Sequence, residues 1–107
     1  MARSGEPTEI RQLARYQVRP EALETCLAAI RTFVAYVRAN EPGTLRYDVW
    51  QERDEPTRFV HRFVFRDAAA HRVHSASREV QAFAGVLYPA CLAPVEFVDY
   101  REVVADS

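Results

Sequence analysis

One strand-like segment, Arg58–Phe65, limits the possible folds most, because it carries large apolar side chains on both of its sides. Phe59 and Phe63 fall on one side, and Val60 and Val64 fall on the other. Strict alternation over this length predicts a β-strand. A strand that is apolar on both sides predicts a sheet that is covered on both faces. The chain must therefore supply or recruit two covering layers.

The rest of the chain predicts further strands and helices in a simple order. Alternating side chains predict strands over 10–18, 44–53 and 95–104 as well. Helical spacing of apolar residues predicts a long helix that Pro20 opens and that ends near Asn40 to Gly43. Two shorter helices are predicted over 68–76 and 78–88, capped by Asp67 and Ser77.

The resulting β-α-β-β-α-β order is the ferredoxin-like, split βαβ arrangement of an α+β fold. It predicts a four-stranded antiparallel sheet with helices on one face, in a single domain over 10–104 behind a flexible N-terminal tail, 1–9. Because the helices cover one face only, we expect a second copy to cover the other, which gives a homodimer through the sheet face.

Composition excludes several classes of function. The formal net charge is −1 with acidic and basic residues interspersed, which predicts no nucleic-acid partner and no membrane surface as partner. The chain has no Lys, so Schiff-base chemistry is excluded, and its three Gly form no nucleotide-binding motif. The polar N-terminus lacks a signal peptide, so a cytoplasmic protein with reduced, buried Cys26 and Cys91 is expected.

His61 is the first candidate for chemistry, because it lies in mid-strand between Phe59 and Phe63. A buried imidazole needs a hydrogen-bond partner. Two interpretations stay open: a core histidine satisfied by a neighbour, or a general base that faces a pocket and titrates near physiological pH. If Val60 and Val64 pack under the helices, His61 faces the dimer interface; the opposite phase of the strand turns it toward the helices.

His74 is the second candidate, three residues after His71 on a predicted helix. If Ala70 and Val73 face the sheet, His74 lies at the edge of the inward face and His71 points more outward. The alternative for His74 is a structural hydrogen bond to a loop. The three histidines also permit a metal-site interpretation that includes His61, but no carboxylate or Cys accompanies them at ligand spacing, so no metal site is predicted.

Three stretches of the chain, 40–47, 56–61 and 65–74, resemble the antibiotic biosynthesis monooxygenase (ABM) family, and the similarity runs from Arg15 to Val103. The resemblance implies a ferredoxin-like subunit in a dimeric α/β barrel, with a pocket between sheet and helices. It also implies oxygenation of phenolic or hydroquinone-like substrates without a bound metal or flavin. Haem-degrading relatives carry an Asn on the first strand and a Trp on the third, and this chain has neither.

In the oxygenases that the chain resembles, an Asn near the end of the first helix acts together with aromatic residues on the second strand, which points to Asn40, Tyr47 and Trp50. Asn40 is alternatively a helix terminator. Aromatic residues with polar tips suit a pocket wall or an interface.

Together these observations predict a cofactor-independent monooxygenase that oxidises an apolar, aromatic, quinol-like molecule with O₂. The candidate catalytic residues are His74 and His61. The candidate substrate-binding residues are Asn40, Tyr47, Trp50, Phe63 and Tyr88. Two alternatives remain: a non-enzymatic module that binds a small molecule, and an isomerase or lyase on the same scaffold.

Overall fold

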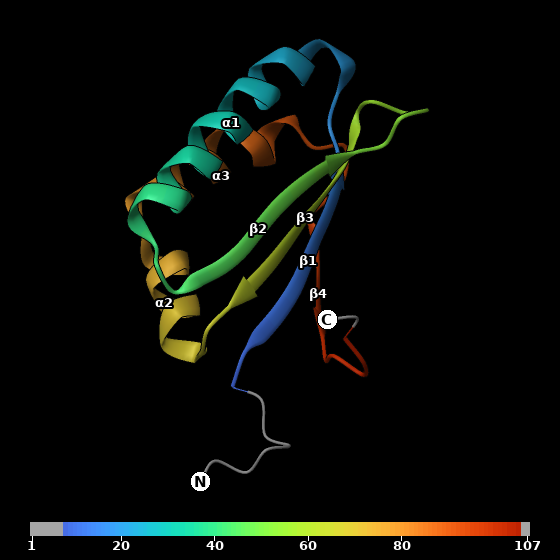
Figure 1. Ribbon diagram of the computed structural model, residues 1–107. Helices are drawn as coiled ribbons and strands as arrows, with labels where there is room; N and C mark the ends of the chain where they lie inside the picture. Colours follow the sequence, from blue (N-terminus) through green and yellow to red (C-terminus); the bar gives the residue numbers. More distant parts are fainter. Residues whose placement is uncertain (1–7, 106–107) are drawn as a thin grey trace, which may run out of the picture.

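The computed structural model describes residues 8–105, and its helices lie on one face of a four-stranded antiparallel sheet (Figure 1). The strands are β1 (Ile10–Gln17), β2 (Thr44–Gln51), β3 (Arg58–Phe65) and β4 (Glu96–Tyr100), in the order β2-β3-β1-β4. The helical elements are the 3₁₀ turn η1 (Pro20–Ala22), α1 (Leu23–Asn40), α2 (Ala68–Ala76) and α3 (Arg78–Ala90). The predicted α+β, ferredoxin-like order is confirmed.

Local sequence signals explain where the helices begin and end. The side chains of Asp67 and Ser77 accept hydrogen bonds from backbone N–H groups in the first turns of α2 and α3, at 2.8 and 3.0 Å, as the capping pattern predicts. α1 ends at Asn40, before Pro42, which cannot continue a helix. In the described part of the chain, no helix is long and apolar enough to cross a membrane.

The predicted boundaries of four elements differ from the structure. The first strand, predicted over 10–18, ends at Gln17. The last strand, predicted over 95–104, is confined to Glu96–Tyr100, because it pairs only with β1 and this pairing ends near the first residue of β1. α3 runs to Ala90 instead of 88, and β2 ends at Gln51 instead of 53. Of the tail predicted over 1–9, residues 1–7 lie outside the described residues.

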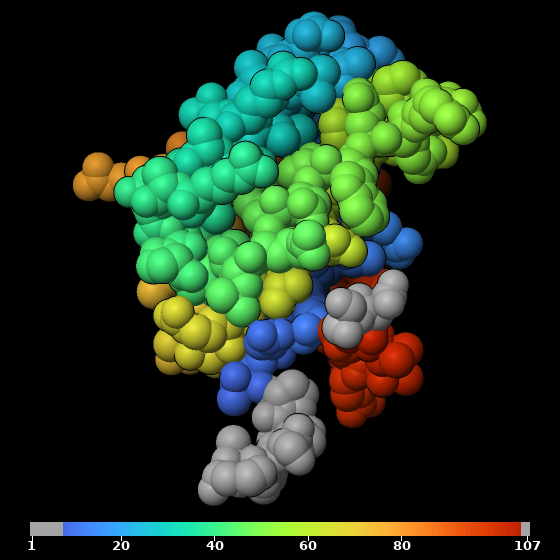
Figure 2. Space-filling view, viewed as in Figure 1, coloured from blue at the N-terminus to red at the C-terminus, as the bar shows by residue number. Residues whose placement is uncertain are grey.

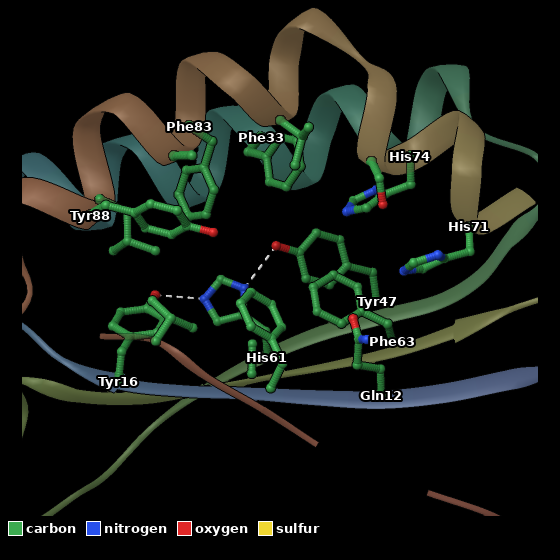
Figure 3. A pocket seen from close by; sticks show the side chains of 17 residues that line it. Gln12, Tyr16, Phe33, Tyr47, His61, Phe63, His71, His74, Phe83 and Tyr88 are labelled. Atoms are coloured by element: carbon green, nitrogen blue, oxygen red, sulfur yellow. Dashed lines mark hydrogen bonds between the residues drawn. The ribbon is translucent and has the colours of Figure 1, made fainter. Parts of the chain in front are cut away.

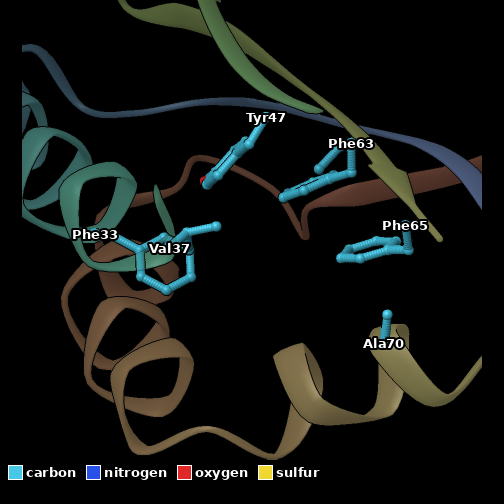
Figure 4. Close-up of a cluster of buried hydrophobic side chains, with 7 residues drawn as sticks. Phe33, Val37, Tyr47, Phe63, Phe65 and Ala70 are labelled. Atoms are coloured by element: carbon cyan, nitrogen blue, oxygen red, sulfur yellow. The ribbon is translucent and has the colours of Figure 1, made fainter. Parts of the chain in front are cut away.

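The structure shows which side of β3 faces the helices. Phe59, His61, Phe63 and Phe65 are all buried beneath the helices, whereas Val60 and the other alternate residues are half-buried or exposed on the opposite face. Phe63 and Phe65 pack against Phe33 and Val37 of α1, Tyr47 of β2 and Ala70 of α2 in one core cluster (Figure 4). His61 therefore faces the helices, not the uncovered face of the sheet.

The uncovered face of the sheet is less apolar than the alternation predicts. Half-buried Val60 and Val64 of β3 are interleaved with ion pairs, among them Arg62–Asp48 at 3.1 Å and Arg11–Glu102 at 2.8 Å. The Arg62 guanidinium also lies over the Trp50 ring, 4.8 Å from its centroid. This face thus combines apolar strips with charges of both signs.

The two cysteines are free thiols. Cys26 is buried in the second core cluster, and Cys91 packs at the edge of it. Burial raises the pKa of both thiols, so both favour the protonated form.

The turn after α1 approaches α2 closely. Side chains of α1 and β2 lie against one another on the face shown in Figure 2, and the turn that joins them brings Gly43 next to Ala70 of α2. A Cβ atom on Gly43 would lie 2.6 Å from the Ala70 Cβ. The backbone is held there by a 2.8 Å hydrogen bond from the Arg66 N–H to the Gly43 carbonyl. Glycine at this position therefore allows the turn to dock on α2.

We expect Gly43→Ala to destabilise the fold by about 1–3 kcal/mol, because the added methyl group overpacks a rigid contact. Gly85→Ala is the matched control: nothing lies within 4 Å of its Cβ position, and alanine favours the interior of α3 by about 0.5–1 kcal/mol. Urea unfolding of both variants measures the two changes. Equal effects at both positions would contradict the close docking of the turn.

Candidate functional site

A mostly apolar cavity of about 250 Å³ lies between the sheet and the helix layer (Figure 3). Phe33, Phe63 and Phe83 form part of its wall, and the rings of Phe33 and Phe83 stack with their centroids 4.8 Å apart. Tyr88 on α3 and Phe97 on β4 also line it and are 52% and 54% exposed. These two side chains therefore mark its solvent-accessible rim.

A chain of three polar side chains crosses the sheet side of the cavity. The Tyr16 hydroxyl lies 2.6 Å from Nε2 of His61, and the Tyr47 hydroxyl lies 2.8 Å from Nδ1 (Figure 3). Each side chain comes from a different strand, because β3 lies between β1 and β2. Both ring nitrogens of this buried imidazole are thus satisfied by tyrosine hydroxyls.

Burial determines the protonation state of this chain. His61 is 2% exposed, and desolvation lowers its pKa to about 3. Burial also raises the pKa of Tyr16 and of Tyr47 well above the usual range. All three groups are therefore neutral at physiological pH, and His61 is unsuited to accept a proton from a substrate.

A second polar pair borders the cavity on its helix side. Nδ1 of His74 lies 2.9 Å from Oε1 of Glu41, and both side chains are buried. The Thr44 hydroxyl donates to the same carboxylate oxygen at 2.8 Å. A carboxylate can only accept, so Nδ1 of His74 carries the hydrogen and Nε2 keeps a free lone pair. Figure 3 shows the His74 ring directed toward the space between α2 and the sheet.

The other oxygen of Glu41, Oε2, is buried and has no hydrogen-bond partner within residues 8–105. A buried carboxylate with one unsatisfied oxygen is compensated poorly by a neutral imidazole. The hydrogen bond from His74 to Oε1 therefore fixes the orientation of the imidazole ring.

The structure brings together five of the predicted site residues, which all line the cavity: His61, His74, Tyr47, Phe63 and Tyr88. His71 lies at the cavity edge, with its ring 5.0 Å from that of Phe65. No group of three side chains in the described residues is placed to hold a metal ion.

Two predicted substrate-binding residues, Asn40 and Trp50, lie away from this cavity. The Asn40 side chain is exposed and donates to the Tyr36 carbonyl at 3.0 Å, at the end of α1, so it acts as a helix terminator. Trp50 is 53% exposed and lies on the uncovered sheet face, because it alternates with the inward-facing Tyr47 and Val49 along β2.

Two residues of the site, Glu41 and Tyr16, were not predicted from the sequence. Glu41 follows the end of α1 by one residue and is 33 positions from His74, so no spacing pattern connects them. Tyr16 shares the inward face of β1 with Ala14, which pairs with His61. Only the register of β1 against β3 reveals that Tyr16 reaches the imidazole.

The lowered pKa of His61 predicts a loss of stability in acid. Because the folded pKa lies below that of an unfolded histidine, the unfolded chain binds more protons between about pH 6.5 and pH 3. The stability present above pH 6.5 is therefore lost as the pH falls through this window. Between pH 7 and pH 5, we expect the wild type to lose about 2 kcal/mol more unfolding free energy than His61→Phe. Urea titrations of both proteins at the two pH values measure this difference, and parallel losses would contradict it.

Comparison with known proteins identifies the family and the fold. The family model for antibiotic biosynthesis monooxygenases matches residues 9–86, whereas no curated protein sequence matches the chain significantly. The chain is similar to a putative antibiotic biosynthesis monooxygenase from Bacteriodes thetaiotaomicron (TM-score 0.86, 20% identity, 94% of each chain covered). It is also similar to Rv0793 from Mycobacterium tuberculosis (0.83, 20%, 92% of this chain and 99% of that one).

A third similar structure is a variant of SnoaB, a cofactor-independent oxygenase from Streptomyces nogalater (TM-score 0.79, 21% identity, 92% of this chain and 97% of that one). These likenesses confirm the fold. With the family model matching from β1 into α3, the chain belongs to the antibiotic biosynthesis monooxygenase family.

Proposed function

We propose that this protein is a cofactor-independent monooxygenase that oxidises a small aromatic molecule bearing an acidic hydroxyl group. The observation that carries the proposal is the buried His74–Glu41 pair at the edge of an apolar cavity. Membership of the family and the fold shared with a cofactor-independent oxygenase support it.

His74 acts as the general base. Its free Nε2 accepts the proton of the substrate hydroxyl, and Glu41 holds the ring orientation and stabilises the imidazolium that forms. Thr44 keeps the carboxylate in place through its 2.8 Å hydrogen bond. The deprotonated ring is electron-rich at the carbons ortho and para to the oxygen, and the reaction takes place at one of these that carries a hydrogen.

The substrate itself supplies all the electrons for the reaction. A ring C–H becomes a C=O group, one atom of O₂ enters the product, and the other leaves as water with the two hydrogens that the substrate loses. The ring gives up four electrons and O₂ takes up four. The wall of Phe33, Phe63 and Phe83 keeps the anion from bulk water, which would otherwise protonate it.

Two other functions fit the same cavity and would give different results. An isomerase or lyase would form product from the same substrate without consuming O₂. A binding module would bind the ligand saturably without forming any product.

We expect the purified protein to consume O₂ with one- or two-ring quinols, and His74→Ala to lower kcat by about 10²–10⁴-fold, because the general base is lost. Glu41→Gln should lower kcat by about 10²-fold, since an amide orients the ring poorly and does not stabilise the imidazolium. An oxygen electrode and product analysis by mass spectrometry with ¹⁸O₂ measure both effects.

Val73→Ala is the control, because Val73 also lies on α2 but is 61% exposed. It should retain the wild-type rate. Wild-type activity in His74→Ala would exclude His74 as the base, and an absence of O₂ uptake over a panel of one- and two-ring quinols would refute the monooxygenase proposal.

We also propose that a second copy of the chain covers the uncovered sheet face, which would complete a dimeric α/β barrel. Leu13, Val60, Val64 and Val98 are only half-buried in one subunit. The charges between them have both signs, as in the Arg62–Asp48 pair. A two-fold axis brings such a surface against itself, so side chains of opposite charge can pair across the interface.

In sedimentation velocity at micromolar concentration, the wild type should run at about twice the 12.3 kDa of one chain. Val60→Arg should shift it to the monomer, because a buried unpaired charge disrupts an interface. Val73→Arg, on exposed α2, should remain dimeric. A monomeric wild type would contradict the proposed interface.

A further inference from the structure

The Tyr16–His61–Tyr47 chain holds one hydrogen more than its own hydrogen bonds can use. A neutral imidazole has one N–H and one acceptor nitrogen, so one tyrosine donates to His61 and the other accepts from it. The tyrosine that accepts keeps its own O–H free. In the described part of the chain, neither hydroxyl has a second hydrogen-bond partner. Both tyrosines line the cavity, so the free O–H is available there.

We infer that this chain is a recognition subsite that donates one hydrogen bond to a carbonyl or phenolate oxygen of the substrate. Which tyrosine donates depends on the tautomer of His61: a hydrogen on Nδ1 frees the O–H of Tyr47, and a hydrogen on Nε2 frees that of Tyr16. Burial lowers the pKa of His61 to about 3, so the imidazole stays neutral throughout the physiological range of pH. One tyrosine O–H, and not both, is therefore free in that range.

The cavity thus has two polar regions of opposite character. His74 offers an acceptor, and the tyrosines offer a donor. The rings of Tyr47 and Phe63 lie between His61 and His74: the Phe63 centroid is 6.1 Å from the first imidazole and 5.4 Å from the second. A ligand that satisfies both regions carries a hydroxyl group on one side and an oxygen acceptor on the other.

The volume of the cavity limits the size of this ligand. At about 250 Å³, it is larger than the roughly 150 Å³ cavity that holds a benzene molecule and smaller than the roughly 300–1,000 Å³ of a typical drug-sized site. One or two rings therefore fit. If the proposed function holds, the substrate class is a mono- or bicyclic hydroxyaryl ketone or quinol, and not a polycyclic one.

The subsite also has a role in the proposed reaction. The assignment of a substrate class rests on that proposed function. When His74 removes the hydroxyl proton of a hydroxyaryl ketone, negative charge spreads through the ring to the conjugated carbonyl oxygen on the far side. A pre-positioned O–H at that oxygen stabilises the charge as it develops. Tyr16 and Tyr47 are then substrate-contacting residues, and His61 is a positioning residue that acts through them.

A matched pair of ligands tests the subsite without any turnover. The probes are 6-hydroxy-1-tetralone and 5,6,7,8-tetrahydro-2-naphthol, which share a skeleton and differ in the carbonyl group. Isothermal titration under nitrogen at pH 6 keeps both phenols neutral. The wild type should bind the ketone about 10-fold more tightly, as one net hydrogen bond allows.

The double variant Tyr16→Phe/Tyr47→Phe should lose this preference and keep its affinity for tetrahydronaphthol, which shows that the cavity is intact. In case the variant does not fold, ¹⁵N NMR of labelled histidine in the wild type gives a second measurement. The ketone should drive neutral His61 toward one tautomer, and tetrahydronaphthol should not. Equal affinities in the wild type, a preference that survives in a folded double variant, or identical tautomer ratios with both ligands would overturn the subsite.

The failure of this inference can be told from failure of the proposed function. Preferential binding of the ketone without O₂ uptake would reject the monooxygenase and retain the subsite. O₂ uptake with equal affinity for the two probes would reject the subsite and retain the monooxygenase.

Discussion

A buried imidazole in the middle of β3 is stable only because a tyrosine hydroxyl meets each of its ring nitrogens. The three side chains come from three adjacent strands, so this arrangement depends on the register of β1 and β2 against β3. The Tyr16–His61–Tyr47 arrangement also determines the chemistry of the sheet side of the cavity. Desolvation keeps His61 uncharged, and a neutral imidazole leaves one hydroxyl free to donate.

The helix side of the cavity depends on a different contact. The turn after α1 docks against α2 because Gly43 has no side chain to strike Ala70. This docking brings Glu41 within hydrogen-bond distance of His74. The two histidines thus have different surroundings: His61 is buried among hydroxyls and stays neutral, whereas Nδ1 of His74 is held by a carboxylate.

The division between an acceptor and a donor region suits a reaction that needs no bound cofactor. In the proposed reaction, an acidic hydroxyl would lose its proton on one side, and the charge that develops would be stabilised on the other. The phenyl rings between the two regions contribute shape and exclude water. The polar groups that border this cavity come from separate elements, β1, β2 and β3 on the sheet side and α2 with the turn after α1 on the helix side.

The amino-acid sequence by itself determined the element order, the capped ends of α2 and α3, and the inward position of Phe59, His61, Phe63 and Phe65 relative to one another, because these follow from local periodicity and capping chemistry. It also identified His74, Tyr47, Phe63 and Tyr88 as candidates for the site. Only the tertiary structure decided that the His61 side of β3 faces the helices, that Tyr16 and Glu41 join the site, and that Asn40 and Trp50 do not line it. These facts depend on strand register and on the docking of a turn. Both are set by contacts between residues far apart in the chain, so the pattern of neighbouring residues does not predict them.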